Sequence, residues 1–186
     1  SSVTSDLAVN FHEDGTLTVT GGGNTLNNAE IIERISAGSG SDTFVFEEGA
    51  VFGGFIGGGG GINTLDYSAY TSDWVWVDLR SDGYVTGTTG VANIQNITAG
   101  AGGDILIGND QTNIIIGGDG DDVIDGVGAG DTLRGGLGND TYVLRPEDGN
   151  QTIVENAGEG TDLVDYSQST LGVTVNLQTD TASGTA

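Results

Sequence analysis

Acidic side chains recur every nine residues through the middle of the chain, each followed two residues later by an apolar or aromatic one. Five nonapeptides run without a gap from residue 99 to residue 143: AGAGGDILI, GNDQTNIII, GGDGDDVID, GVGAGDTLR and GGLGNDTYV. Their sixth positions are Asp104, Asn113, Asp122, Asp131 and Asp140. Calcium is a hard cation that takes about six to eight oxygen ligands from carboxylates, amides and backbone carbonyls. This spacing therefore predicts a row of calcium sites.

Glycine is concentrated in the turn before each of these sixth positions. Aiming several successive carbonyl oxygens at one ion requires a sharp turn, often through positive φ, which glycine adopts without strain. We therefore expect the turns to supply backbone ligands beside the side chains. The candidates of this kind are Gly100, Gly102, Gly117, Gly118, Asp119, Gly120, Gly136 and Gly138.

The last three residues of each nonapeptide are enough for one very short strand. The eighth position is apolar or aromatic in all five units, so we expect that side chain to point inward. Each unit is then half a coil, and residues two units apart should stack on the same edge. This places Asp104, Asp122 and Asp140 in one ladder and Asn113 and Asp131 in another on the opposite edge, with an ion between vertical neighbours.

The nonapeptides follow the pattern G-G-x-G-x-D-x-U-x, and this stretch resembles the RTX (hemolysin-type) calcium-binding repeat family. Five adjacent copies make the match far more specific than a single glycine motif. The resemblance implies an all-β fold, namely a right-handed parallel β-roll (a β-solenoid) of calcium-binding nonapeptides, here interrupted by β-hairpins. It also implies several bound Ca²⁺ ions and a segment of a large repetitive bacterial protein, typically exported by type I secretion.

The charge balance is that of a chain that needs cations to fold. Against 27 acidic residues there are four arginines, which gives a formal charge of −23, and 35 glycines add an entropic cost. Composition alone would favour a disordered acidic linker. The nine-residue register argues against that reading, because bound calcium would neutralise the ladders and convert binding energy into folding energy. Since cytosolic calcium is scarce, we expect an extracellular or cell-surface location.

Weaker copies extend the pattern on both sides. Upstream, AGSGSDTFV has Asp42 in the sixth position and GGGGINTLD has Asn63, whereas GVANIQNIT has Gln95 there. Downstream, AGEGTDLVD has Asp162. Asp42, Asn63 and Asp162 are therefore further candidate calcium ligands, and coils without an acid are expected to stack on apolar contacts alone.

A longer repeat overlies the nonapeptides. The segment DYSAYT at 66–71 recurs as DYSQST at 165–170, and each copy precedes an alternating strand and a polar turn. Such alternation, which also occurs near the N-terminus, predicts β-hairpins. The expected units are a hairpin (1–27), a short degenerate roll (28–66), a middle hairpin (67–89), the main roll (90–165) and the start of a third hairpin (166–186). Because the last copy stops inside the repeat, we expect an excerpt of a longer protein or a subunit that a neighbouring copy completes.

Several function classes are disfavoured. The single histidine, His12, lies at a predicted hairpin end without the spacing of a metalloprotease or a catalytic triad. The chain has no lysine and no phosphate-binding glycine loop, and it has no cysteine for disulfides or zinc. Its negative charge disfavours nucleic acid, and no apolar run is long enough for membrane insertion. We therefore do not expect an enzyme.

Two function classes remain. The first is a calcium-stiffened structural module of an extracellular bacterial protein, such as an adhesin, a surface layer or a filament, with self-assembly between neighbouring copies. The second is a calcium-dependent module that accompanies a secreted enzyme and binds a partner or a neutral glycan. Its contact residues would be Trp74 and Trp76, because alternation through WVWVDLR (74–80) places them, with Asp78, on the face opposite the core.

Overall fold

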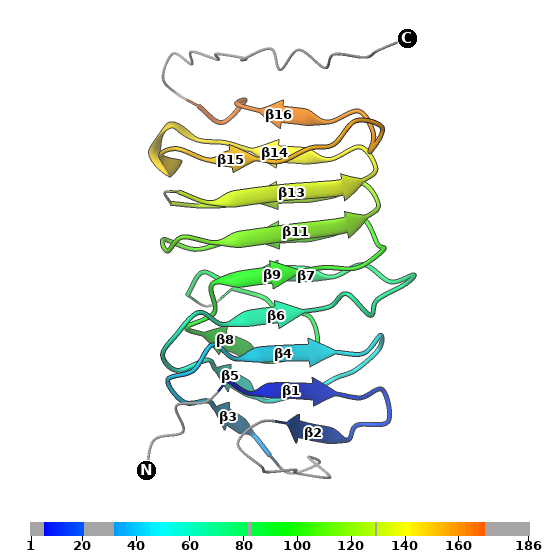
Figure 1. The fold of residues 1–186 in the computed structure, drawn as a ribbon, viewed down its shortest axis with the longest axis vertical. Coiled ribbons are helices and arrows are strands. Elements are labelled where there is room, and N and C mark those ends of the chain that lie inside the picture. Colours follow the sequence, from blue (N-terminus) through cyan, green and yellow to red (C-terminus); the bar gives the residue numbers. More distant parts are fainter. Residues whose placement is uncertain (1–5, 21–31, 82, 129, 170–186) are drawn as a thin grey trace.

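The computed structural model describes residues 6–20, 32–81, 83–128 and 130–169, whose strands are stacked along one long axis (Figure 1). The regular structure within these residues consists of short β-strands and one 3₁₀ turn, η1 (Pro146–Asp148), with no α-helix. The expected all-β class is confirmed. The described part of the chain accordingly contains no helix that could cross a membrane.

Three sheets contain all these strands. The eight-stranded sheet has the spatial order β15 (Thr152–Ile153), β13 (Thr132–Leu137), β11 (Ile114–Asp119), β9 (Asn96–Thr98), β6 (Thr64–Asp66), β4 (Thr43–Phe46), β1 (Ala8–Phe11) and β2 (Leu17–Thr20). The five-stranded sheet has the order β16 (Leu163–Asp165), β14 (Thr141–Val143), β12 (Val123–Asp125), β10 (Ile105–Ile107) and β7 (Trp76–Asp78). The three-stranded sheet has the order β3 (Arg34–Ser36), β5 (Phe55–Gly57) and β8 (Gly90–Ala92). Neighbouring strands pair in parallel, except that β1 and β2 form an antiparallel hairpin.

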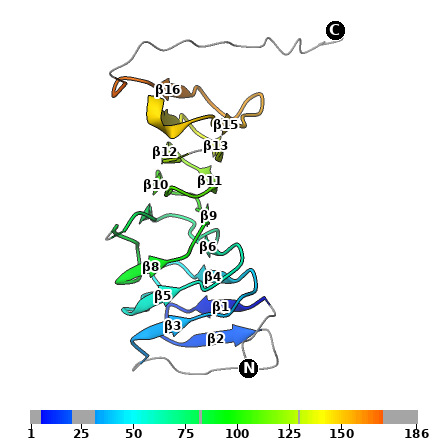
Figure 2. The ribbon, with the colours of Figure 1, turned by 90° about the vertical axis from the view of Figure 1, so that its left-hand side faces the viewer.

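From β9 onward, successive strands alternate between the two larger sheets. Figure 2 shows β10 and β12 on one side of the molecule and β11 and β13 on the other. Parallel pairing sets Leu106 opposite Ile124, and Ile115 opposite Leu133. Hydrogen bonds between the turns also join residues 18 apart. Two nonapeptides therefore complete one coil here, as the repeat predicts.

The eighth residues of the nonapeptides and of their weaker copies build the core, together with Val77 of the middle segment. Strand register places these side chains directly above one another in two columns, one along each large sheet, and all of them are fully buried. The columns are Phe44, Leu65, Ile97, Ile115 and Leu133, and Val77, Leu106, Ile124 and Tyr142. Their neighbours in the strands, such as Ile114 and Val123, are exposed because adjacent side chains point to opposite faces.

The coils nearer the N-terminus are longer. The stacked residues Asp42 and Asn63 are 21 residues apart, and the next step, to Gln95, is 32 residues. This region contains the three-stranded sheet and a cluster of aromatic rings, in which Phe11 stacks on Phe46 with ring centroids 4.3 Å apart. This end of the molecule is wider than the region of regular nonapeptides (Figure 2).

The segments predicted as hairpins are part of these sheets. β1 pairs with both β2 and β4, so the N-terminal hairpin forms the end of the eight-stranded sheet. In the middle segment, β7 pairs in parallel with β10, and Val77 makes an antiparallel bridge to Val85. Most of the third predicted hairpin, 166–186, lies outside the described residues.

The alternation expected around β7 holds for the tryptophans and is wrong at Asp78. Trp74 is 57% exposed and Trp76 39% exposed, and Val75 between them is fully buried. Asp78, expected on the exposed face, is buried, because Arg80 donates hydrogen bonds to both of its carboxylate oxygens at 2.9 and 2.7 Å. The paired charge makes burial of this carboxylate tolerable.

Candidate metal centre

A row of aspartates lies where the turns enter the five-stranded sheet. Asp104, Asp122, Asp140 and Asp162 immediately precede β10, β12, β14 and β16. The backbone N–H of each donates to Oδ1 of the next, at 2.7 Å from Asp104 to Asp122, 2.8 Å from Asp122 to Asp140 and 3.1 Å from Asp140 to Asp162. We call this row the aspartate ladder. The expected stacking of its first three members is confirmed, and Asp162 continues it.

A second row lies at the edge of the eight-stranded sheet and combines acids with amides. Its members each precede a strand of that sheet; they are Asp42, Asn63, Gln95, Asn113, Asp131 and Gln151. The N–H of Asp42 donates to Asn63 Oδ1 at 2.9 Å, and the N–H of Asn113 donates to Asp131 Oδ1 at 2.8 Å. We call this row the mixed ladder. Asn113 and Asp131 stack in it as expected.

Five ladder aspartates each have one buried oxygen without a hydrogen bond. Their Oδ1 atoms accept backbone N–H groups, whereas their Oδ2 atoms have no hydrogen-bond partner among the described residues. These are Asp42, Asp104, Asp122, Asp131 and Asp140, each at most 1% exposed. Burying an unpaired ionised oxygen is costly. A cation between the coils would be the missing partner, so these residues fit calcium.

The first glycine of each turn makes room for the unpaired oxygen. A Cβ atom on Gly117 would lie 2.0 Å from Asp122 Oδ2, and one on Gly135 would lie 1.9 Å from Asp140 Oδ2. Both distances are far below van der Waals contact, so each aspartate folds back over the first residue of its own nonapeptide. Only glycine leaves that space, which explains its place in the repeat.

Further glycines pack backbone against backbone between coils. Gly118 and Gly136 have φ angles of 119° and 111°, which side chains disfavour. A Cβ on Gly118 would lie 2.0 Å from the Gly100 carbonyl oxygen, and one on Gly136 2.1 Å from that of Gly118. Gly102, Gly120 and Gly138 stack in the same way. The Gly100 carbonyl accepts the Asp119 N–H at 2.8 Å and keeps a second lone pair for an ion.

Burial disfavours the charged form of the ladder aspartates. It raises the pKa of Asp104 to about 6 and that of Asp122 to about 8, where the charges of Asp104 and Asp140 add to the effect. Burial likewise raises the pKa of Asp42, Asp131 and Asp140. A bound cation would favour the carboxylate form, so a cation and protons would compete for these oxygens.

Asparagine makes the ladder contact without leaving an unpaired oxygen. Asn63 Oδ1 accepts a backbone N–H as an aspartate would, while its Nδ2 donates to the carbonyls of Gly60 at 3.2 Å and Asn93 at 2.8 Å. Asn113 Nδ2 likewise donates to the Gln95 carbonyl at 2.6 Å. At these two steps the amide supplies donors where an aspartate would need a cation.

Gln151 is a possible ligand that the sequence analysis did not include. Its Nε2 donates to the carbonyls of Gly128 at 2.7 Å and Asp148 at 2.8 Å. This leaves Oε1 buried, without a partner in the described part of the chain, and beside Asp131 Oδ2, with both oxygens next to the open face of Gly126. The apolar Ile153 two residues later was the signal in the sequence.

Glu155 is a second such residue. One of its carboxylate oxygens and one each from Asp140 and Asp162 all lie within 4.8 Å of one another. Glu155 follows β15 by two residues and lies outside any sixth position. No spacing rule indicates it; only the pairing of β15 with β13 brings it to the ladder.

The tryptophans form an exposed aromatic face of the middle segment. Trp76 packs against Tyr84 with ring centroids 5.6 Å apart, and Tyr84 is 58% exposed. Trp74 lines a cavity of about 340 Å³ together with Tyr70 and Asp73. An aromatic face beside a polar rim is suited to contact with another molecule.

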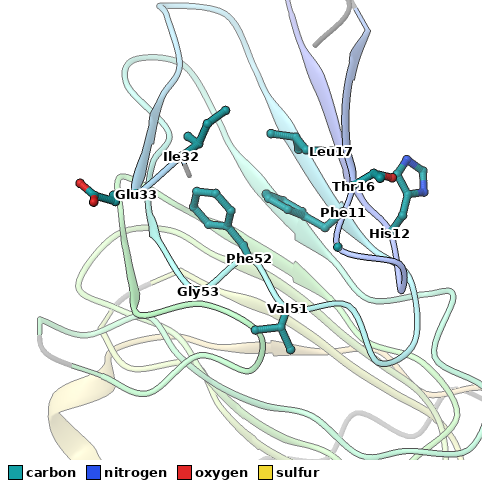
Figure 3. Close-up of a pocket in the computed structure, with 10 residues that line it drawn as sticks. Phe11, His12, Thr16, Leu17, Ile32, Glu33, Val51, Phe52 and Gly53 are labelled. Atoms are coloured by element: carbon teal, nitrogen blue, oxygen red, sulfur yellow. The ribbon is translucent and has the colours of Figure 1, made fainter. Parts of the chain in front are cut away.

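A cavity of about 640 Å³ near the N-terminal end includes the single histidine (Figure 3). The side chains of Phe11, Leu17, Ile32 and Phe52 converge toward its middle, and Glu33 and His12 lie at opposite sides. His12 Nδ1 is 2.8 Å from Glu47 Oε1, and its Nε2 is 3.0 Å from Thr18 Oγ1. Both ring nitrogens are engaged, so this histidine ties the first hairpin to the turn after β4.

No protein-family model matches the chain, and no curated protein sequence matches it. Its candidate sites therefore stand on its own residues and geometry. Of the residues predicted from the sequence, the ladders bring the aspartates together with Asn63 and Asn113, and Trp74 and Trp76 belong to a separate surface.

Proposed function

We propose that this chain is a calcium-binding structural module of an extracellular bacterial protein, in which ions between the coils drive the folding of a right-handed parallel β-roll and stiffen it. The observation that carries the proposal is the set of buried, unpaired Oδ2 atoms in the two ladders. With a formal charge of −23, such carboxylates would oppose compaction unless cations neutralised them. The resemblance to RTX repeats supports the same function and an export by type I secretion to the cell surface or medium.

The proposed side-chain ligands are the aspartates of both ladders: Asp42, Asp104, Asp122, Asp131, Asp140 and Asp162. The stacked carbonyls of the glycine turns are the proposed backbone ligands. Asn63 and Asn113 are left out of the proposed set, because their amides have hydrogen-bond partners on both the oxygen and the nitrogen. Enzymatic activity is not part of the proposal.

Circular dichroism with and without a chelator tests this function. We expect a largely unfolded chain in chelator and a β-rich spectrum in millimolar calcium. Magnesium is the matched control and should not substitute, because it prefers a tight octahedral shell and keeps its waters. A β-rich spectrum that chelation leaves unchanged would contradict the proposal.

The exposed aromatic face favours a second candidate function, a calcium-dependent binding module. Trp74 and Trp76 are large and exposed, and Trp74 lines a cavity together with the polar residues Asp73 and Thr86. Such a surface suits a neutral glycan, on whose sugar rings aromatic side chains stack, or a neighbouring copy of the chain. Both functions require the same calcium-bound scaffold, so the tryptophan variants described below separate them.

A further inference from the structure

The last step of the aspartate ladder differs from the steps before it. The intervals from Asp104 to Asp122 and from Asp122 to Asp140 each lie between two ladder carboxylates. At the step from Asp140 to Asp162, Glu155 adds a third, and one oxygen of each carboxylate lies within 4.8 Å of the other two.

The fold holds Glu155 in this position. β15 pairs in parallel with β13, and continuing that register sets Glu155 level with Gly135, the glycine that accommodates Asp140 Oδ2. The hydroxyl of Tyr142 donates to Glu155 Oε1 and accepts the N–H of Gly135. The glutamate side chain is therefore directed toward the turn that contains Asp140.

Unpaired buried oxygens distinguish this cluster from a chance group of surface acids. Asp140 is 1% exposed, and its Oδ2 has no hydrogen-bond partner in the described ranges. The same holds for the buried Oε2 of Glu155. Within these ranges no arginine forms an ion pair with Asp140, Glu155 or Asp162. Two of the three clustered carboxylates thus each have a buried oxygen without a donor.

We infer that Asp140, Glu155 and Asp162 form a three-carboxylate cation site that binds calcium more tightly than the other intervals and ties the two large sheets together. Asp140 and Asp162 precede strands of the five-stranded sheet, whereas Glu155 follows a strand of the eight-stranded sheet. Calcium affinity increases with the number of charged ligands, so this site fills first. The inference rests on the proposed function, because the coils must stack for the three residues to meet.

Calorimetric titration of the full chain with calcium tests the inference. Glu155→Gln removes one charged ligand and keeps the side-chain size, so the tightest class of sites should weaken by about tenfold or more. Glu33→Gln is the matched control: it makes the same change at an exposed position in the longer coils, outside the three clustered groups. It should change that affinity by less than about threefold.

Terbium luminescence locates the site independently of the affinity. The Tyr142 hydroxyl contacts Glu155, so this ring should sensitise emission from the first terbium ion to bind. Tyr142→Phe removes both the phenol that sensitises terbium and the hydroxyl that holds Glu155, so it should lose most of the early emission. Tyr70→Phe, which changes a tyrosine in the longer coils, should retain that emission.

The outcomes separate this inference from the proposed function. If Glu155→Gln binds calcium as Glu33→Gln does, while Asp122→Asn binds it more weakly than the parent chain, the calcium scaffold stands and the three-carboxylate site is wrong. The same conclusion follows if early terbium emission survives Tyr142→Phe unchanged. If neither Asp122→Asn nor Glu155→Gln alters calcium binding, both proposals fall.

Discussion

The coils from β9 to β16 and those from β1 to β8 stack in different ways. The first group repeats at short intervals, and its turns bury Asp104, Asp122, Asp131 and Asp140 with unpaired oxygens. The second group has longer coils, and its part of the mixed ladder includes the amide of Asn63. Its core contains a cluster of stacked aromatic rings. Asp42 is its one ladder aspartate with an unpaired buried oxygen in the part of the chain that the structure describes.

Under the proposed function, one backbone arrangement is stabilised by two kinds of chemistry. Apolar columns run through both groups, but among the described residues only the short coils bury successive carboxylates with unpaired oxygens. In the longer coils, amide N–H groups and ring stacking make contacts that need no ion. Calcium dependence should therefore be strongest from β9 onward.

The largest expected effect is a regional response to calcium removal. In chelator, we expect amides from β9 to β16 to lose nearly all protection from hydrogen exchange, because repulsion between ladder carboxylates is no longer offset. Amides of β1, β4 and β6 should retain slower exchange. Mass spectrometry of exchanged peptides measures this, and equal loss of protection in both groups would refute the distinction.

The next largest effect is expected from single substitutions in the aspartate ladder. Asp122→Ala removes a ligand of two intervals and leaves the buried N–H of Asp104 without its acceptor, a loss of about 1–3 kcal/mol on its own. The sequence alone predicts a smaller effect for Asp140→Ala, as the end of its ladder. Because the Asp140 N–H also donates to Asp162, we now expect the two variants to raise the calcium midpoint of folding similarly. Asp110→Ala, at an exposed position of a neighbouring turn, is the control.

Acid should favour the fold when calcium is absent. The pKa of Asp104 is about 6 and that of Asp122 about 8 in the folded chain, above the usual aspartate value of about 4. The folded state therefore binds more protons, and its stability falls as pH rises through this window. In chelator, circular dichroism should show β structure increasing from about pH 8 to about pH 5. Asp122→Asn should reduce this dependence, and a chain that unfolds further on acidification would contradict it.

Converting an amide step into an acid step should make a coil of the mixed ladder depend on calcium. In Asn113→Asp, the introduced carboxylate cannot donate to the Gln95 carbonyl, so the chain should be less ordered in chelator. In calcium it should bind about one additional ion opposite Asp131. Gln168→Glu, which changes an amide to an acid at an exposed position, should change neither result, and calorimetry counts the ions.

The nine-residue periodicity of the sequence is sufficient to predict how the regular coils stack. Two nine-residue units complete one coil, so Leu106 and Ile124, which are 18 residues apart, stack on each other. The aspartates before their strands stack with them. The stacking of the longer coils could not be predicted from the sequence, since no fixed period relates Asn63 to Gln95.

Contacts between particular side chains also could not be predicted from the sequence. The burial of Asp78 depends on Arg80, and the position of Glu155 depends on the register of β15. Neither contact follows from alternation or from the nonapeptide pattern. The hydrogen bonds of the Asn63 amide, which distinguish it from a proposed calcium ligand, also appear only once the backbone of the neighbouring coil is in place.

The smallest expected effect on folding belongs to the aromatic face. Trp74 and Trp76 are exposed, whereas the core contacts of this segment come from Val75 and Val77, both fully buried. The double change of both tryptophans to threonine should therefore leave calcium-induced folding nearly intact, since it removes little buried apolar area. If the face binds a neighbouring copy or a neutral glycan, the same variant should lose assembly in sedimentation or glycan binding in calorimetry. A variant that fails to fold in calcium would show that the tryptophans stabilise the longer coils, and the contact-site hypothesis would then be dropped.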